Sequence, residues 1–258
     1  MISPSSRRAL LVGINYQNYP DISLNGCIND VLEVKSLLME KFAYQESDIV
    51  LLREDEPDHL PTYDNIMKEL WNLVSTSENL EEIWFHYSGH GTQITNTVSL
   101  NGSDDLLVPL DYKESGYIVD TQILGFLKKT KCRTIFGFDC CHSGTICDLQ
   151  WSFQYIDREP WYVRNKMENN VVQNPDIYIF SGCMDDQNCL DTYNAIAQKH
   201  IGAFTAKFVE SLRELTGDID VLSLYVILCK KMIDSKYIQR PVLSCSSENP
   251  RYIIKKLK

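Results

Sequence analysis

The sequence predicts an α/β fold, a mostly parallel central sheet flanked by helices. Two observations carry this prediction. Short, continuous apolar runs recur along the chain, as expected for strands buried on both faces. Segments with apolar residues at helical spacing alternate with these runs. Strands that alternate with helices favour parallel pairing, because each connection crosses over one face of the sheet.

The first third of the chain contains three apolar runs, RALLVGI, DIVLLR and EIWFHY. Between them, apolar residues from Ile28 to Phe42 follow a helical period, and Thr62 precedes a second helical pattern as a residue type that caps helix N-termini. The predicted elements are, in order, a strand at 8–14, a helix at 27–42, a strand at 48–53, a helix from Thr62 to Val74 and a strand at 82–87.

The remainder of the chain is less regular. A loop rich in Thr, Asn, Ser and Gly is predicted from residue 92 to Asp104 and Asp105, and residues 151–175 mix charges and aromatics like an irregular excursion. The other predicted elements are a helix at 121–129, strands at 131–138 and 176–180, helices at 202–215 and 220–233, and a last strand at 241–244.

Composition excludes several classes of protein. The 258 residues carry 25 Lys and Arg against 35 Asp and Glu, a net charge of −10 that opposes nucleic-acid binding. No apolar run approaches the roughly 18 residues of a membrane span, and no signal peptide is recognisable. The chain has nine cysteines, an odd number, and its sequence shows no secretory signal. Reduced thiols and a cytoplasmic location are therefore expected.

Two chemically reactive blocks follow two of the predicted strands. In open α/β sheets, ligands bind beyond the carboxyl ends of the strands. The run at 82–87 ends in SGHG with His90, and the run at 131–138 ends in DCCHSG with Cys141. If these strands are neighbours, an imidazole can generate a thiolate nucleophile, and the backbone amides of Gly91 and Cys141 can hold an oxyanion. From the residues alone, ordinary packing and turn formation remain an open interpretation.

The sequence resembles the metacaspases, caspase-like cysteine peptidases. The resemblance covers residues 8–250 and rests on the two reactive blocks and on further segments in the same order. These segments are ALLVGIN at 9–15, LNGCIND at 24–30, VPLD at 108–111, SGC at 181–183 with DDQ at 185–187, and GAFT at 202–205. The resemblance implies a single caspase-like domain over residues 1–258.

The resemblance implies a catalytic dyad of Cys141 and His90. Cys141 directly precedes His-Ser-Gly, as the nucleophile of the family does, so Cys140 and His142 are interpreted as neighbours. The family cleaves after Arg or Lys, whose side chains need an acidic pocket.

By position, Asp30 and Asp139 match the acidic residues of that pocket, and Cys27 and Ser88 match its wall. For Asp30, a carboxylate in the first turn of a helix is the alternative interpretation. Expected partners are therefore proteins or peptides with Arg or Lys before the scissile bond, with no nucleic acid and no membrane.

The resemblance also implies calcium as a cofactor, since many metacaspases need it. Calcium prefers hard oxygen ligands, mainly carboxylates. Asp104 or Asp105, Asp120 and Asp148 match the calcium-binding residues of the family. The family often has a second Asp where this chain has Thr121, and the missing charge predicts a weaker site. Solvated loop carboxylates are the alternative interpretation.

The chain is expected to be a monomeric, minimal catalytic core, without the Pro-rich extension or the long linker of some metacaspases. Self-processing is a further expectation. Arg158, Arg164, Lys166 and Lys199 fall in predicted loops and are candidate cleavage sites, although ordinary surface charges are the favoured interpretation.

Three other functions compete with peptide hydrolysis. A zinc site of Cys140, Cys141, His142 and Cys147 is disfavoured, because adjacent residues in an extended chain point in opposite directions and no CxxC pair is present. A nucleotide site is disfavoured because no glycine-rich phosphate fingerprint occurs. The main alternative is a caspase-fold regulatory or binding module with weak or no proteolysis.

Overall fold

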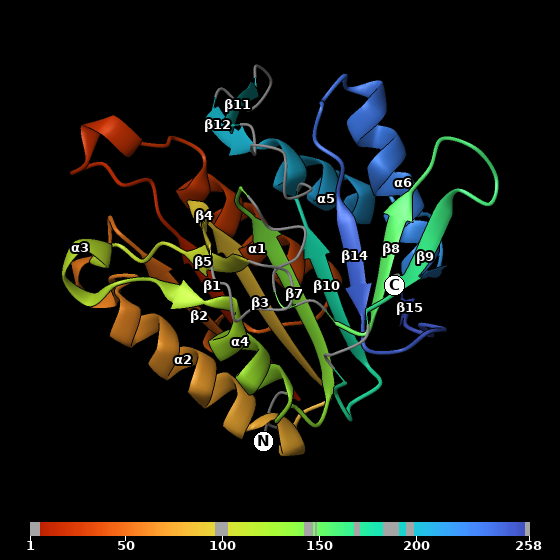
Figure 1. Cartoon of the computed structure of the whole chain (residues 1–258), viewed down its shortest axis with the longest axis horizontal. Coiled ribbons are helices and arrows are strands. Elements are labelled where there is room, and N and C mark those ends of the chain that lie inside the picture. The colour runs from red at the N-terminus through yellow and green to blue at the C-terminus, as the bar shows by residue number, and fades with distance from the viewer. Residues whose placement is uncertain are drawn as a thin grey trace.

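An eight-stranded twisted sheet runs through the middle of the protein (Figure 1). The computed structural model describes residues 6–95, 103–141, 147, 149–167, 171–182, 191–194 and 199–255. The strand order is β2-β1-β3-β7-β10-β14-β8-β9. The strands are β1 (Arg7–Gly13), β2 (Ile49–Arg53), β3 (Glu82–Ser88), β7 (Arg133–Asp139), β8 (Trp151–Tyr155), β9 (Tyr162–Lys166), β10 (Ile177–Ser181) and β14 (Val242–Cys245).

The first five strands in this order pair in parallel, as predicted. The last three pair antiparallel, so the sheet is mixed. Alternation along β1 shows how both faces are buried: Ala9 and Leu11 enter one hydrophobic cluster, and Leu10 and Val12 enter the other. The continuous apolar runs in the sequence follow from this double burial.

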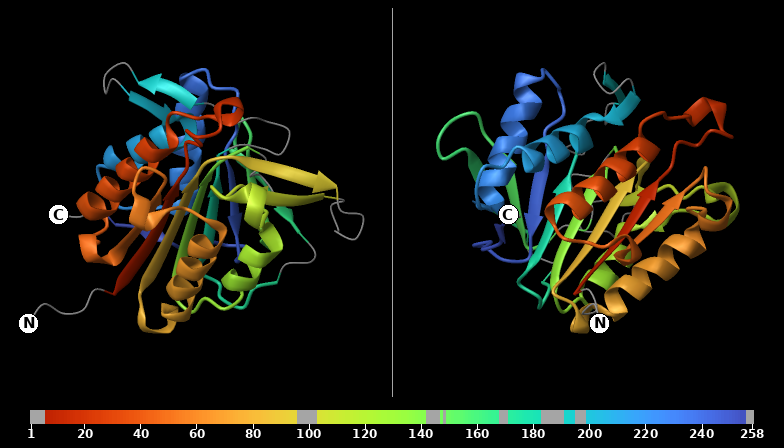
Figure 2. Two further views of the ribbon diagram at one scale, coloured as in Figure 1. Left: turned by 90° about the vertical axis from the view of Figure 1, so that its left-hand side faces the viewer. Right: turned by 180° about the vertical axis from the view of Figure 1, so that it is seen from behind.

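Helices cover both faces, as Figures 1 and 2 show. On one face lie α1 (Cys27–Lys41), α5 (Ala203–Arg213) and α6 (Val221–Asp234), and on the other lie α2 (Tyr63–Ser75) and α4 (Asp120–Leu127). Thr62 caps α2 as predicted, because its side chain accepts a hydrogen bond from the Asn65 amide at 3.4 Å. The minor elements are β4 (Gly91–Thr95), β5 (Ser103–Leu107), α3 (Tyr112–Ser115), β6 (Ile118–Val119), β11 (Asp191–Asn194), β12 (Lys199–Gly202), β13 (Ile219–Asp220), β15 (Ile253–Ile254) and 3-10 turns at Pro20–Ile22, Glu46–Asp48, Pro57–His59 and Ser77–Asn79.

Two predicted irregular segments contain strands instead. Part of the predicted loop before Asp104 is β4, which pairs antiparallel with β5. The predicted excursion after residue 151 contains the β8–β9 hairpin, with β9 at the edge of the large sheet. There Arg164 and Lys166 lie over the ring of Trp151, 5.3 and 5.8 Å from its centroid. Charged residues are typical of edge strands, which explains why the segment lacks an apolar pattern.

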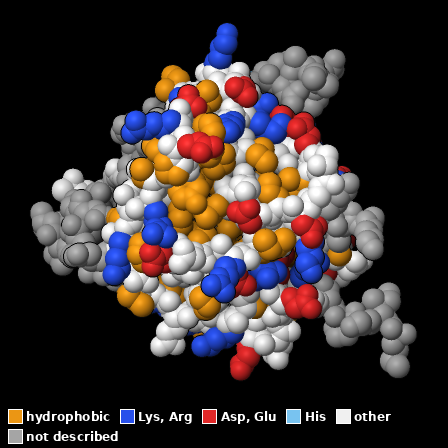
Figure 3. Space-filling model, turned by 90° about the vertical axis from the view of Figure 1, so that its right-hand side faces the viewer, with side chains coloured by type: hydrophobic (Ala, Val, Ile, Leu, Met, Phe, Trp, Pro, Cys, Tyr) orange, Lys and Arg blue, Asp and Glu red, His pale blue; other side chains and the backbone are white. Residues whose placement is uncertain are grey.

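Figure 3 shows the face on the β8–β9 side of the molecule, where hydrophobic side chains gather among charged ones. Tyr155 and Tyr162 of this hairpin are only partly buried and pack against the core. Among the helices that the structure describes, none is long and apolar enough to cross a membrane.

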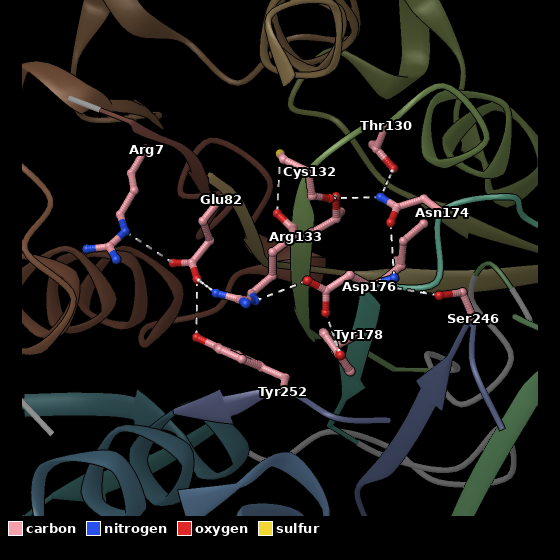
Figure 4. A network of polar contacts seen from close by, with 12 residues as sticks. Arg7, Glu82, Thr130, Cys132, Arg133, Asn174, Asp176, Tyr178, Ser246 and Tyr252 are labelled. Carbon is pink, nitrogen blue, oxygen red and sulfur yellow. Dashed lines mark hydrogen bonds and ion pairs between the residues drawn. The ribbon is translucent and has the colours of Figure 1, made fainter. Parts of the chain in front are cut away.

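A buried ion-pair network closes the end of the sheet at which the parallel strands begin (Figure 4). Glu82, at the start of β3, is 2% exposed. Its carboxylate lies 4.0 Å from Arg7 Nε and 3.5 Å from Arg133 Nη1. The hydroxyls of Tyr44 and Tyr252 donate to it at 3.0 and 3.2 Å. The network therefore joins β1, β3 and β7 to Tyr252 near the C-terminus, at the amino ends of the parallel strands.

Candidate active site

The two reactive blocks leave the sheet side by side. β3 and β7 pair in parallel with Ser88 opposite Asp139, the last residue of each strand. Just beyond, the Gly89 amide donates to the carbonyl oxygen of Asp139 at 3.3 Å. The sequence left open whether these strands are neighbours, and the structure shows that they are.

A cleft of about 90 Å³ opens beyond the carboxyl ends of these two strands. Its lining includes all six side chains that the sequence assigned to the dyad and the substrate pocket: Cys27, Asp30, Ser88, His90, Asp139 and Cys141. They come from the start of α1 and from the ends of β3 and β7. Residues up to 114 positions apart in sequence are therefore brought to one small site by the parallel topology.

His90 is held by contacts on both its ring and its backbone. Its Nε2 atom lies 2.7 Å from the carbonyl oxygen of Ile22. The ring also packs against Tyr16, with centroids 4.8 Å apart, and the His90 amide donates to the Tyr16 hydroxyl at 3.0 Å. Because a carbonyl only accepts hydrogen bonds, Nε2 carries a proton, and in the neutral ring Nδ1 is the basic nitrogen.

Cys141 is partly exposed, whereas its neighbour Cys140 is fully buried. Of the two adjacent thiols, Cys141 is thus the one that a bound substrate can reach. A β-carbon at Gly91 would collide with the Cys141 carbonyl oxygen, so the approach of β4 to this residue requires glycine. Gly91 and Cys141, whose amides were predicted to form the oxyanion hole, are therefore adjacent. His142 lies outside the described residues.

Asp30 is 1% exposed and is bound from two other elements. Ser88 Oγ donates to its Oδ2, and the Gly202 amide donates to its Oδ1 at 2.7 Å. Asp30 does lie in the first turn of α1. Its carboxylate also lines the cleft and is bound by Ser88 and Gly202, so the position of Asp30 is compatible with both the pocket and the helix-turn interpretation.

Asp139 is 5% exposed, and Thr205 at the start of α5 donates to it twice. The Thr205 amide and hydroxyl lie 2.9 and 2.7 Å from Oδ2 of Asp139. The two carboxylates converge on Gly202, where a β-carbon would collide with Asp139 Oδ2 and stand 2.9 Å from Asp30 Oδ2. This convergence places two buried carboxyl groups close together at the cleft.

Gly202 and Thr205 donate hydrogen bonds to the two carboxylates, and the sequence assigned neither of them a role. The only signal was the GAFT segment at 202–205, which was matched to the family without a role. The Ile22 carbonyl was missed as well, because a backbone acceptor leaves no mark in the sequence.

The residues expected to bind calcium are grouped only in part. Asp104 and Asp105 lie on β5, and Asp120 begins α4. Burial raises the pKa of Asp120 to about 6, with a further rise from the charges of Asp105 and Asp104 and an opposing effect of the Thr121 amide. Gln93 donates to Asp105 at 2.7 Å.

Within the described residues, no three His, Cys, Asp or Glu side chains form a group that could hold a metal ion. Asp148, the fourth residue of the expected calcium set, lies outside the described residues. The described carboxylates alone thus do not form a complete ligand set for calcium. The same finding leaves the zinc interpretation without support from Cys140, Cys141 and Cys147.

The chain is similar in sequence to known metacaspases. The family model for "Metacaspase, peptidase C14 domain" matches residues 7–150. Metacaspase-1B of Aspergillus fumigatus is 30% identical over an alignment that covers 93% of this chain and 69% of that protein. Metacaspase-1 of Scheffersomyces stipitis is also 30% identical, over 93% of this chain and 70% of that protein.

Two solved structures show the fold. A protein of Geobacter sulfurreducens superimposes with a TM-score of 0.65 at 18% identity, over 98% of this chain and 97% of that chain. Caspase-1 from Spodoptera frugiperda gives a TM-score of 0.63 at 12% identity, over 98% of this chain and 91% of that chain. The fold is therefore caspase-like.

Proposed function

The chain belongs to the metacaspases, the peptidase C14 family, and from this premise we propose that it is a cysteine endopeptidase that cleaves peptide bonds after Arg or Lys. One observation carries the proposal: a single cleft is lined by a thiol, an imidazole and two buried carboxylates. The first pair suits nucleophilic acyl transfer, and the second suits a cationic side chain next to the scissile bond.

In the proposed mechanism, His90 accepts the thiol proton of Cys141 on Nδ1, while the Ile22 carbonyl keeps Nε2 protonated. The thiolate attacks the scissile carbonyl carbon, and the backbone amides of Gly91 and Cys141 stabilise the oxyanion. Collapse breaks the C–N bond, and the leaving amine takes the proton from His90. Water, deprotonated by His90, then hydrolyses the thioester and restores the thiol of Cys141.

The proposed substrate pocket binds the Arg or Lys side chain between Asp30 and Asp139. Ser88, Gly202 and Thr205 hold these carboxylates by hydrogen bonds. Two carboxylates that converge in a buried site repel each other, and a cation between them relieves that repulsion. The pocket therefore selects Arg and Lys and rejects Asp.

Covalent labelling tests this proposal against the main alternative, a caspase-fold binding module with little proteolysis. A peptidyl-arginine chloromethyl ketone should label Cys141 stoichiometrically, and the aspartate analogue should not. A module without a competent dyad would react with neither reagent faster than an exposed thiol does.

We also propose that calcium binds beside Asp120. The support is the raised pKa of Asp120, which indicates that its ionised form is poorly stabilised by the described residues around it. A divalent cation would reverse that, with Asp104, Asp105 and Asp148 as further ligands. Thr121 in place of a carboxylate predicts a modest affinity.

Self-processing is proposed at Arg158. Of the four candidate basic residues, Arg164 and Lys166 lie on β9 and Lys199 on β12, so the prediction that they lie in loops was wrong. Arg158 is exposed in the turn between β8 and β9. A monomer is also proposed, since Arg164 and Lys166 on the edge strand disfavour pairing with a second sheet. A cytoplasmic location stays a prediction.

A further inference from the structure

A chain of hydrogen bonds leads from the core of the sheet to the Asp139 carboxylate. Nε2 of His86, on β3, lies 3.2 Å from Oγ1 of Thr205, the third residue of α5. That hydroxyl lies 2.7 Å from Oδ2 of Asp139. His86 and Thr205 are both 0% exposed, so the contacts are shielded from water. His86 has no part in the mechanism described above.

The direction of each hydrogen bond follows from the chemistry of the groups. An ionised carboxylate only accepts, so the single hydroxyl proton of Thr205 goes to Asp139. The Thr205 oxygen must then accept from His86, which fixes the protonated nitrogen of that ring as Nε2. Burial lowers the pKa of His86 to about 3, so the ring is neutral at physiological pH.

The other nitrogen of His86 shows that this arrangement is not simply good packing. Nδ1 is buried and has no hydrogen-bond partner among the described residues. Opposite it, Gly137 provides the space, because a β-carbon there would stand 2.6 Å from Nδ1. An apolar side chain would avoid the cost of an unsatisfied buried polar atom. A histidine at this position is therefore better explained by what Nε2 does for Thr205.

We propose that His86 and Thr205 are positioning residues that lock the orientation of the Asp139 carboxylate and thereby make the pocket prefer Arg over Lys. With His86 donating to the Thr205 oxygen, the hydroxyl proton stays directed at Asp139. A guanidinium is a planar fork whose two parallel hydrogen bonds need a carboxylate in a fixed plane, whereas an ammonium is a point charge that tolerates rotation. The inference rests on the proposed function, since it concerns the pocket of that same site.

Two matched pairs of variants test the inference. Thr205→Val keeps the shape and the backbone amide but removes the hydroxyl, and Thr205→Ser keeps the hydroxyl. His86→Leu removes the donor, and His86→Gln keeps an N–H near the position of Nε2. Each variant is assayed on two peptide reporters that differ only in Arg or Lys before the scissile bond. Competitive inhibition by agmatine, a guanidinium, and cadaverine, an ammonium, gives a binding readout on the same variants.

Thr205→Val should lower kcat/KM about tenfold on the Arg reporter and about twofold on the Lys reporter, since a hydrogen bond to a charged group is lost. In Thr205→Val, inhibition by agmatine should weaken more than inhibition by cadaverine. His86→Leu should shift the Arg/Lys ratio of kcat/KM and the agmatine/cadaverine ratio of inhibition in the same direction as Thr205→Val. Thr205→Ser and His86→Gln should keep the Arg/Lys ratio of the wild type. A merely structural role would lower both substrates equally by reducing the active fraction, which alkylation of Cys141 by iodoacetamide measures.

An unchanged Arg/Lys ratio in Thr205→Val, or an equal loss in Thr205→Ser, overturns the inference while the proposed function stands. A wild-type protein that cleaves neither reporter overturns the proposed function and the inference with it. If Thr205→Val does not fold, the His86 pair decides in the same way, because those variants leave the Thr205 hydroxyl in place.

Discussion

The Nε2 atom of His90 lies 2.7 Å from the carbonyl oxygen of Ile22. This contact assigns a proton to Nε2 and leaves Nδ1 as the basic nitrogen of a ring whose cleft also contains Cys141. The backbone of the turn at Pro20–Ile22 therefore orients the proposed base.

Replacing the proposed base should abolish activity without unfolding the protein. We expect His90→Ala to lower kcat/KM on an Arg reporter by about 100- to 10,000-fold, the usual contribution of a general base. His59→Ala is the matched control, because His59 is exposed on a 3-10 turn away from the cleft. Full activity in His90→Ala, with an unchanged melting temperature, would contradict the proposed role.

Gly202 offers a steric test of the substrate pocket. In Gly202→Ala, the new methyl group would collide with Asp139 and crowd Asp30, so one carboxylate must move. Activity on Arg and Lys reporters should fall together by at least about tenfold. Gly125→Ala is the control, since a β-carbon there meets nothing within 4 Å. Equal activity of the two alanine variants would argue against a pocket at this position.

The ion pairs of Glu33 join α1 to β12 and α5. Glu33, on α1, lies 2.6 Å from Lys199 Nζ of β12 and 2.6 Å from Arg213 Nη1 of α5. Burial by itself would raise the pKa of Glu33, but the hydrogen bonds and charges of these two cations lower it overall.

Because the pKa of Glu33 is lower in the folded chain, its ionised form stabilises the fold. The contribution is complete above the unfolded pKa of 4.5 and is lost as pH falls through the lower pKa of the folded state. We expect Glu33→Gln to lower the melting temperature by about 2–4 °C at pH 7, for a loss of about 1 kcal/mol. The difference should disappear at acidic pH. A decrease in melting temperature that persists unchanged at pH 3, or an equal decrease in the exposed control Glu78→Gln, would rule out this explanation.

Calcium binding can be tested by thermal unfolding, independently of activity. Calcium should raise the melting temperature of the wild type but not of Asp120→Asn, because binding to the folded state alone is stabilising. Without calcium, Asp120→Asn should be at least as stable as the wild type, since its ionised carboxylate is poorly stabilised. Asp58→Asn, an exposed residue, is the control. An equal calcium shift in wild type and Asp120→Asn would place the ion elsewhere.

The sequence predicted the parts of the fold that bury continuous apolar runs. β1, β3 and β7 carry them, and the rule that sites lie beyond the carboxyl ends of parallel strands led directly to His90 and Cys141. β4 and β9 were missed because they are polar strands at sheet edges, where pairing partners decide the structure more than local pattern does. β8 lies between β14 and β9 and was missed because it belongs to the same stretch of mixed charged and aromatic residues.

The supports of the site were not predictable from local pattern. Thr205 is 66 residues from Asp139, and Gly202 is 172 residues from Asp30. Contacts at such separations depend on how α5 meets the sheet, and no spacing rule encodes them. His86 was likewise counted as part of an apolar strand, although its imidazole contacts Thr205.

If Cys141 is the nucleophile of a peptidase specific for basic residues, a panel of reporter peptides will show it. Peptides that differ only in Arg, Lys or Asp before the scissile bond are assayed with wild type and Cys141→Ala, each with and without calcium. We expect the wild type to hydrolyse the Arg and Lys peptides but not the Asp peptide, and Cys141→Ala to hydrolyse none of the three. Hydrolysis by Cys141→Ala, or a preference for Asp, would contradict the proposed function.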